Sequence, residues 1–399
     1  MAIGFTIGTG SVTSMIVAGS RFGMALLWVL VLSCFFSWVM MEAYGRFTLV
    51  TGQTALSAFR KNLKFGKAIA ILIIIGVTIG QWNSLIGILG ISSNVIFEVL
   101  GMFFPAIISN EYIAVLGIAI LIISVFYYIL LIGNFSLFEK VLVVFVTFMG
   151  LSFLLSMFIN LPDSKEVLNG LRPKIPSVKG GKMMVAAFVG TTMAAATFLS
   201  RPLFLKGKGW DMKNLKDQKR DAIWAAVLIF IISGSIMAVA TGALFKNGKE
   251  VEKVLDMVYA LEPIAGKFAV AIFFLGTLSA GLSSIFPILM ISSLLIADYQ
   301  NGTLDTKSKQ FRIIAGLACI VSLTVPITGA NPVQIQVLSQ VFNVFVLPLV
   351  IAGMMILINN KMLMGKHKAG LILNLGMLLA LIFSLIISYN GVLGILENL

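Results

Sequence analysis

The chain has 399 residues, of which 59% are hydrophobic and only 11% are charged, and its formal net charge is +13. Together with a mean hydropathy of +1.03, this composition excludes a soluble globular domain of ordinary proportions and predicts an integral membrane protein. In such a protein a basic excess indicates topology and contact with anionic lipid, and no nucleic-acid partner is expected.

Long apolar runs predict an all-α bundle, because helices satisfy their own backbone hydrogen bonds in lipid and no alternating barrel strands occur. The clearest run, residues 22–41, is uncharged throughout and long enough to cross a hydrocarbon core of about 30 Å. The connections are short, so residues 1–399 are expected to form one transmembrane domain. In chain order, helices are expected at about 2–20 (broken), 22–45, 66–100, 111–133, 136–160, 182–205 (broken), 218–246, 263–298, 310–329, 333–358 and 370–396.

The segments outside these runs give further expectations. No cleavable signal peptide is expected, because no charged segment with a small-residue cleavage site is found. Cys34 and Cys319 lie in apolar runs, which argues against a disulfide framework or a cysteine metal cluster and leaves the redox compartment open. The linkers at about 161–181 and 247–262 have room for short surface helices.

Lysine and arginine are distributed unequally between alternate connections. With a cytoplasmic N-terminus the inner connections hold 18 of these residues and the outer ones 10, while Arg201 falls within a helix. We therefore expect a multi-pass protein of a prokaryotic plasma membrane with its N-terminus in the cytoplasm. The only histidine, His367, falls in a basic inner connection and is expected to be a solvated loop residue, not a metal ligand.

Two of the expected helices carry interruptions at corresponding positions. Gly8-Thr9-Gly10-Ser11 lies within the first run, and VGTTMAAATFLSRP, residues 189–202, weakens the sixth. Paired interruptions indicate an inverted-repeat transporter with its binding site near mid-membrane, where unwinding exposes amides of one half-helix and carbonyls of the other. The alternative is that the glycines of the first run serve only close helix packing.

Four stretches carry a family resemblance: AGSRFGMALLW (18–28), GRFTLVTGQ (45–53), SAGLSS (279–284), and VLSQVFNVFVLPL (337–349) followed by NNKMLMG. They resemble the Nramp divalent-metal transporters, which share the LeuT-type fold, and the resemblance spans nearly the whole chain. It implies two inverted five-helix repeats, about 1–160 and 181–360, plus an extra helix at about 370–396. About 11 transmembrane helices would result, with helices 1 and 6 broken.

The chain departs from the family pattern where the resemblance places the metal ligands. The family's first-helix Asp-Pro-Gly-Asn falls on Gly8-Thr9-Gly10-Ser11, and its sixth-helix Met-Pro-His falls on Ala194-Ala195-Ala196. The carboxylate and the thioether are therefore missing, unless Met193 replaces the missing Met. The family's acidic third-helix residue falls near Asn83, its later sixth-helix His falls on Arg201, and its tenth-helix Gln remains as Gln340.

These replacements change the electrostatics expected of the site. A divalent cation must exchange tightly held water for anionic or strongly polar ligands, and soft metals also favour Met or His. The amides and hydroxyls that remain predict a neutral, donor-rich cup at two half-helix N-termini. The predicted substrate-binding residues are Gly8, Thr9, Gly10, Ser11, Asn83, Thr191, Thr192, Ala194, Ala195, Ala196, Thr197 and Gln340, and no metal ligand is expected.

The sequence thus predicts a secondary transporter that moves a small monovalent anion, with bicarbonate as the first candidate, by alternating access. Three alternatives stay open: transport of a divalent metal (Mn, Fe or Mg) through a rearranged site, uptake of an amino acid or carboxylate, and a non-transporting membrane receptor. No Ser/His/Asp, Cys/His or paired-carboxylate arrangement converges, so neither an enzyme nor a cofactor is expected. The oligomeric state stays open.

The coupling ion is a separate question. Ser283 and Ser284 fall where LeuT-type sodium sites draw hydroxyl ligands, which makes Na+ a candidate coupling ion; alternatively, the serines bond their own backbone. Arg201 is expected either to add positive charge near the site or to reach the cytoplasmic surface. Glu42 and Glu98 are expected at helix ends in polar surroundings, with a gating or proton role as the alternative.

Overall fold

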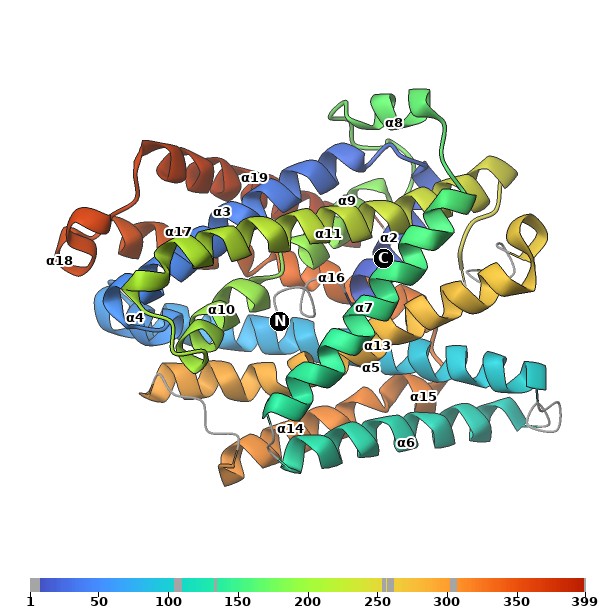
Figure 1. Cartoon of the computed structure of the whole chain (residues 1–399), viewed down its shortest axis with the longest axis horizontal. Helices are drawn as coiled ribbons and strands as arrows, with labels where there is room; N and C mark the ends of the chain where they lie inside the picture. The colour runs from blue at the N-terminus through green and yellow to red at the C-terminus, as the bar shows by residue number, and fades with distance from the viewer. Residues whose placement is uncertain are drawn as a thin grey trace.

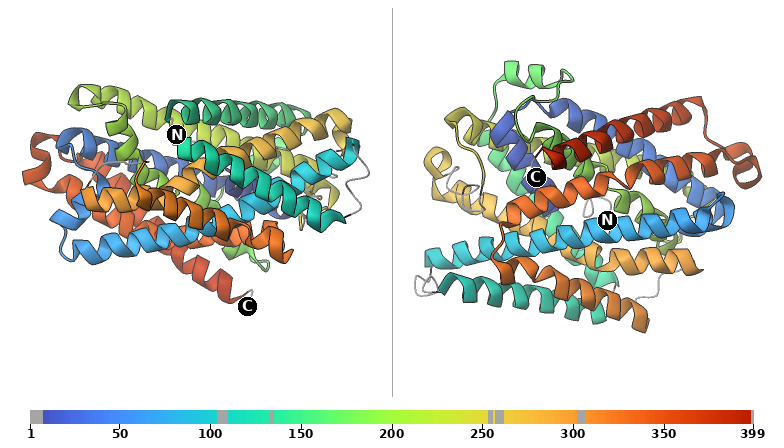
Figure 2. Two further views of the ribbon diagram at one scale, coloured as in Figure 1. Left: turned by 90° about the horizontal axis from the view of Figure 1, so that it is seen from below. Right: turned by 180° about the vertical axis from the view of Figure 1, so that it is seen from behind.

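The structure is a computed structural model that describes residues 8–103, 110–132, 135–252, 256, 262–301 and 307–397. Helices make up most of these ranges, which contain no strand, so the predicted all-α fold is confirmed. Most of the helices lie along the long axis of the molecule in one bundle, with α8 (Ser164–Gly170) on its edge (Figures 1 and 2).

The helix bounds agree closely with the expected runs. Nine spans in the described residues are long and apolar enough to cross a membrane. α2 and α7, which are not among these nine, take the places of the other two expected segments. The main helices are α2 (Thr9–Phe22), α3 (Leu27–Thr51), α5 (Gly66–Phe103), α6 (Glu111–Ile132), α7 (Phe135–Ile159), α9 (Gly181–Thr192), α10 (Ala195–Gly207), α11 (Leu215–Ala243), α13 (Glu262–Asn301), α14 (Lys309–Ser322), α15 (Thr324–Thr328), α16 (Pro332–Val344), α17 (Leu347–Asn359) and α19 (Leu371–Leu396).

Several boundaries differ from the expectation. The run at 310–329 divides into α14 and α15, and the run at 333–358 divides into α16 and α17. A proline within α15 and another at the start of α17 disfavour a continuous helix in each run. A short helix, α4 (Ala55–Asn62), was not predicted, while α8 confirms the surface helix expected in 161–181. α2 begins at Thr9, so Gly10 and Ser11 are helical, and the part of the first run before Gly8 lies outside the described residues.

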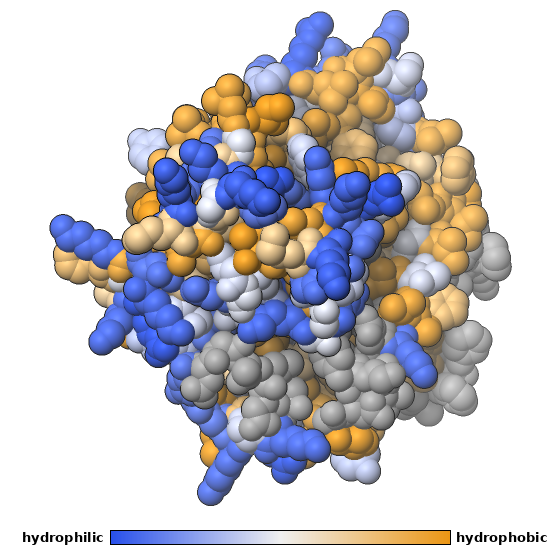
Figure 3. Space-filling model, turned by 60° about the vertical axis from the view of Figure 1, so that its left-hand side comes forward, coloured by the Kyte–Doolittle hydropathy of each residue, from blue (hydrophilic) through white to orange (hydrophobic). Residues whose placement is uncertain are grey.

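The outer surface has the character expected in lipid. Apolar side chains of α6 and α19 are more than half exposed, which would be unfavourable in water. Examples are Ile113, Leu121, Tyr128, Leu371 and Ile372. Figure 3 turns the end of the molecule that carries α4 and α18 (Lys361–Met364) toward the viewer, and hydrophilic side chains gather there beside apolar surface.

A buried carboxylate attaches α4 to the end of α13. Asp298 is fully buried, and its two oxygens accept hydrogen bonds from the backbone N–H groups of Leu56 at 3.0 Å and Ser57 at 3.3 Å. A negative charge at a helix N-terminus is favourable because the first amide groups lack helical partners. This contact therefore fixes the turn by which the chain passes from α3 to α5.

Replacing Asp298 tests this contact. Asp298→Ala removes both acceptors, and we expect it to destabilise the protein by about 2 kcal/mol, seen as a lower thermal midpoint in detergent. The matched control is Asp163→Ala, because the Asp163 side chain is 78% exposed; its effect should stay within about 0.5 kcal/mol. Equal midpoints for the two variants would contradict the capping role.

Candidate substrate-binding site

The sixth membrane segment is broken where the sequence predicted a break. α9 ends at Thr192 and α10 begins at Ala195, and the two residues between them, Met193 and Ala194, have non-helical backbone angles. Both residues are buried. No side chain caps the start of α10 and its first turn holds no acidic residue, so its first amide groups face the break uncapped by any described side chain.

The start of α2 has the same character. Gly8 is its extended N-cap residue, no described side chain caps it, and no acidic residue lies in the first turn. Thr9, Gly10 and Ser11 are all buried, and α2 contacts α9 and α16. The N-termini of α2 and α10, both uncapped by described side chains, therefore lie inside the bundle.

Gly10 brings the start of α2 against two glutamine amides of α16. A Cβ at Gly10 would stand 2.5 Å from Nε2 of Gln340 and 2.8 Å from Nε2 of Gln336. Each of these Nε2 atoms donates a hydrogen bond to Oγ of Ser84 on α5, at 3.2 Å and 3.0 Å respectively. The missing side chain thus lets amide donors reach the α2 backbone.

These amides belong to a buried polar network between α5 and α16. Gln340 also donates to Ser339 Oγ at 3.0 Å and accepts from Asn343 Nδ2 at 3.2 Å, while Asn343 Oδ1 accepts from Gln81 Nε2 at 3.2 Å. Of this network the sequence singled out only Gln340. The spacing of residues 336, 340 and 343, which puts amide side chains on one helical face, is the signal that could have found the rest.

The placement of Asn83 is corrected by the structure. Its side chain is only partly buried, and its Nδ2 donates to the Ile79 carbonyl of the same helix at 2.8 Å. The buried face of α5 carries Gln81 and Ser84 instead. Asn83 therefore lies outside the network.

Gly190 sets the distance between α9 and α16. A Cβ at Gly190 would stand 1.8 Å from the carbonyl oxygen of Gln340, so the two backbones are in direct contact there. Only glycine permits this approach. α16, which carries the glutamine amides, is therefore held against the broken sixth segment.

The predicted hydroxyl donors differ in their surroundings. Ser11 Oγ shares a hydrogen bond of 3.2 Å with Ser233 Oγ, and Thr192 Oγ1 donates to Phe188 O at 2.8 Å. Thr9 Oγ1 is buried and has no hydrogen-bond partner among the described residues. The Thr9 hydroxyl can therefore form a hydrogen bond with a bound substrate. The other predicted residues, Thr191, Ala194, Ala195, Ala196 and Thr197, are all buried around the break.

The serine pair of α13 lies beside the start of α2. Ser283 Oγ and Ser284 Oγ each donate to the Ala280 carbonyl at 3.0 Å, as in the alternative considered from the sequence. A Cβ at Gly8 would stand 1.9 Å from Ser284 Oγ. The Ser284 hydroxyl oxygen is therefore next to the N-cap of α2.

Arg201 neither reaches the surface nor offers an unpaired charge to the break. Its side chain is only 5% exposed, and Nη2 lies 2.9 Å from Asp221 Oδ2 and donates to the Gln218 carbonyl at 3.0 Å. Gln218 Nε2 in turn donates to Glu42, which pairs with Arg46 at 2.6 Å. The surface position considered for Arg201 is wrong, because its buried guanidinium pairs with Asp221 of α11 and is linked through Gln218 to Glu42 of α3.

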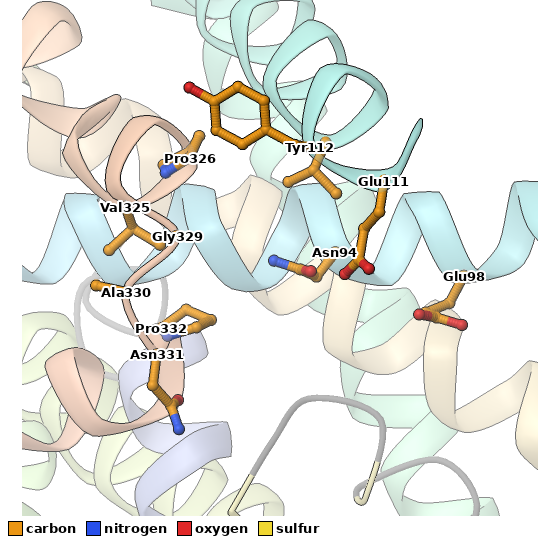
Figure 4. Close-up of a pocket in the computed structure, with 11 residues that line it drawn as sticks. Asn94, Glu98, Glu111, Tyr112, Val325, Pro326, Gly329, Ala330, Asn331 and Pro332 are labelled. Carbon is orange, nitrogen blue, oxygen red and sulfur yellow. The ribbon is translucent and has the colours of Figure 1, made fainter. Parts of the chain in front are cut away.

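A cavity of about 540 Å³ lies along the C-terminal part of α5. Figure 4 shows Asn94 and Glu98 on α5, with Glu111 extending from the start of α6 toward them. Glu98 therefore faces a polar hollow, as expected, whereas Glu42 is buried in the Arg201 cluster. Across the described residues no group of three or more His, Cys, Asp or Glu side chains could hold a metal ion.

Comparison with protein families identifies the chain's relatives. Residues 1–394 match the family described as "Natural resistance-associated macrophage protein-like" (Nramp). The chain is 25% identical to the divalent metal cation transporter MntH of Bacillus subtilis, over 90% of this chain and 82% of that protein. A MntH from Clostridium acetobutylicum is also 25% identical, but that match covers 54% of this chain and half of the relative.

Solved structures show the same fold. The Eremococcus coleocola manganese transporter, in complex with an aromatic bis-isothiourea compound, matches with a TM-score of 0.72 at 16% identity, covering 99% of this chain and 84% of that one. MhsT in complex with L-phenylalanine matches with a TM-score of 0.63 at 17% identity, covering 98% and 97%. These similarities confirm the predicted LeuT-type fold.

Two glycine variants separate the site from the scaffold. Gly10→Ala meets flexible amide tips that can shift, so we expect a folded protein with transport reduced on the order of tenfold. Gly190→Ala meets the Gln340 backbone, which cannot shift cheaply, so we expect a clear loss of thermal stability.

Gly207→Ala is the matched control, because a Cβ there meets nothing within 4 Å. Thermal midpoints and uptake rates should be measured for all three variants. Wild-type transport by Gly10→Ala, or a wild-type midpoint for Gly190→Ala, would contradict these assignments.

Proposed function

The chain belongs to the Nramp family, and we propose that it is a secondary transporter whose central site accepts a small monovalent anion, with bicarbonate as the first candidate. The observation that carries this proposal is that neither α2 nor α10 has an acidic residue in its first turn, although both start inside the bundle. The side chains placed at the start of α2 are those of Thr9, Ser284, Gln336 and Gln340, and all four are neutral.

The charge preference of such a site follows from its donors. Helix N-termini carry partial positive charge, and each contributes about 0.3–1 kcal/mol to anion binding when exposed and up to roughly 2 kcal/mol when partly buried. The Thr9 hydroxyl and the second N–H of Gln336 Nε2 add hydrogen-bond donors, whereas both N–H groups of Gln340 Nε2 are already donated to Ser84 and Ser339. A dication placed here would lose its hydration without gaining a carboxylate, and this cost is large in a buried site.

A second candidate is transport of a divalent metal cation, and the comparisons favour it. Bacterial relatives of this chain are named divalent metal cation transporters, and a structural neighbour is a manganese transporter. The thioether of Met193 also lies in the break itself. In this case Met193, Gln340 and backbone carbonyls would provide the ligands. The anion proposal rests on the residues of this chain alone.

Uptake into proteoliposomes distinguishes the two candidates. We expect saturable bicarbonate uptake and no saturable uptake of Mn²⁺ or Mg²⁺. Gln340→Ala should lower bicarbonate uptake about tenfold, because it removes a buried amide beside α2, and Asn83→Ala, on the partly exposed face of α5, should behave as wild type. Saturable dication uptake that Gln340→Ala abolishes would establish the second candidate instead.

We also propose that Na+ is the coupling ion, with Ser284 among its ligands. Support comes from the position of the Ser284 oxygen beside Gly8, the N-cap residue of α2. Uptake should then require Na+, and Ser284→Ala should raise the Na+ concentration for half-maximal rate. Ser293→Ala, in the same helix but bonded to Phe311, is the control. Uptake independent of Na+ would refute this coupling.

A further inference from the structure

A second cavity, of about 160 Å³, lies between α10 and α11, and of the predicted substrate-binding residues it is lined only by Thr197. Among the residues that line it are Ser200, Arg201, Lys208, Trp210, Asp221 and Trp224. It lies on the half of the sixth segment that follows the break. Its volume suits a small oxyanion, not a nucleotide or a folded peptide.

The guanidinium of Arg201 has an unused donor in this region. Its Nη2 group is held by Asp221 and by Gln218, but its buried Nε–H has no hydrogen-bond partner among the described residues. Arg201 also lines the cavity, so its positive charge is available to attract an anion there.

The charges that face this cavity favour an anion. Arg201 and Lys208 supply two positive charges, and Asp221 supplies one negative charge that is already paired with Arg201. The Lys208 side chain is exposed, its ammonium lies 5.6 Å from the centre of the Trp210 ring, and it belongs to none of the ion pairs between described residues. Glu42, behind Gln218, is paired with Arg46 and is not among the residues that line the cavity.

Aromatic side chains give the mouth of the cavity an interfacial character. Trp224 is 65% exposed on the apolar surface of α11, and Leu228, one turn further along, is also exposed. Tryptophan is typical of the zone where lipid headgroups meet the hydrocarbon core. Phosphate is the anion that this zone offers, and arginine binds phosphate oxygens with more than one donor.

We propose that this cavity is a phosphate-binding site, in which the Arg201 guanidinium and the Lys208 ammonium donate to phosphate oxygens. The phosphate belongs either to an anionic phospholipid, whose chains would follow Trp224 and Leu228, or to a free oxyanion. Bound there, it bridges α10 to α11 and stabilises the half-helix after the break. This site does not depend on which ion the protein transports.

Thermal stability of the full chain tests the proposal in two arms. In detergent, inorganic phosphate is compared with chloride at equal ionic strength; in nanodiscs, phosphatidylglycerol is compared with phosphatidylcholine. We expect a higher midpoint with the phosphate-bearing or anionic partner in at least one arm. Lys208→Gln should weaken the apparent affinity about tenfold, because it removes one charge-assisted bond.

Lys206→Gln is the matched control, because Lys206 is an exposed residue of the same helix that does not line the cavity. It should keep wild-type affinity. Stabilisation only in nanodiscs identifies a lipid headgroup, and stabilisation by inorganic phosphate identifies a free oxyanion site. No stabilisation in either arm, or equal losses in the two lysine variants, would overturn the proposal. Midpoints measured without added phosphate show whether each variant is folded.

Discussion

Direct backbone contact between α9 and α16 at Gly190 is the constraint on which the centre of this protein depends. It places Gln340 beside the broken segment, and the lack of a side chain at Gly10 lets the same glutamine approach the start of α2. Inside a bilayer, backbone groups freed by a break must find partners within the protein. α16 brings polar side chains to the place where those groups are exposed.

The consequence of this packing is a polar but uncharged centre. Gln336, Gln340 and Asn343 bond Ser84 and Gln81 across the α5–α16 interface, so the network is connected without any carboxylate. The buried acids described here lie elsewhere: Glu42 in the Arg201 cluster, and Asp298 at the cap of α4. This arrangement separates the charges that hold helices together from the groups that would meet a substrate.

The sequence predicted much of the fold because its signals are local. Uncharged runs long enough to span lipid located the helices, and Gly190 with the weak helix formers after it located the break. It missed α4, because the group that caps this helix, Asp298, is more than two hundred positions away in the chain. It chose Asn83 instead of Ser84 because the family resemblance locates the helix in the chain but does not determine which of two adjacent residues faces the centre of the bundle. It left Arg201 undecided, since its partners Gln218 and Asp221 on α11 meet it only in the folded bundle.

The names of the relatives favour a divalent metal as the substrate, whereas the neutral centre of this chain favours an anion. A direct search for bound metal distinguishes these two substrates. Crystals of the protein soaked in Mn²⁺ should be measured at a wavelength where manganese scatters anomalously. We predict no anomalous peak between the start of α2 and the break at Met193. A peak there, coordinated by protein oxygens or by the Met193 sulfur, would contradict an anion site.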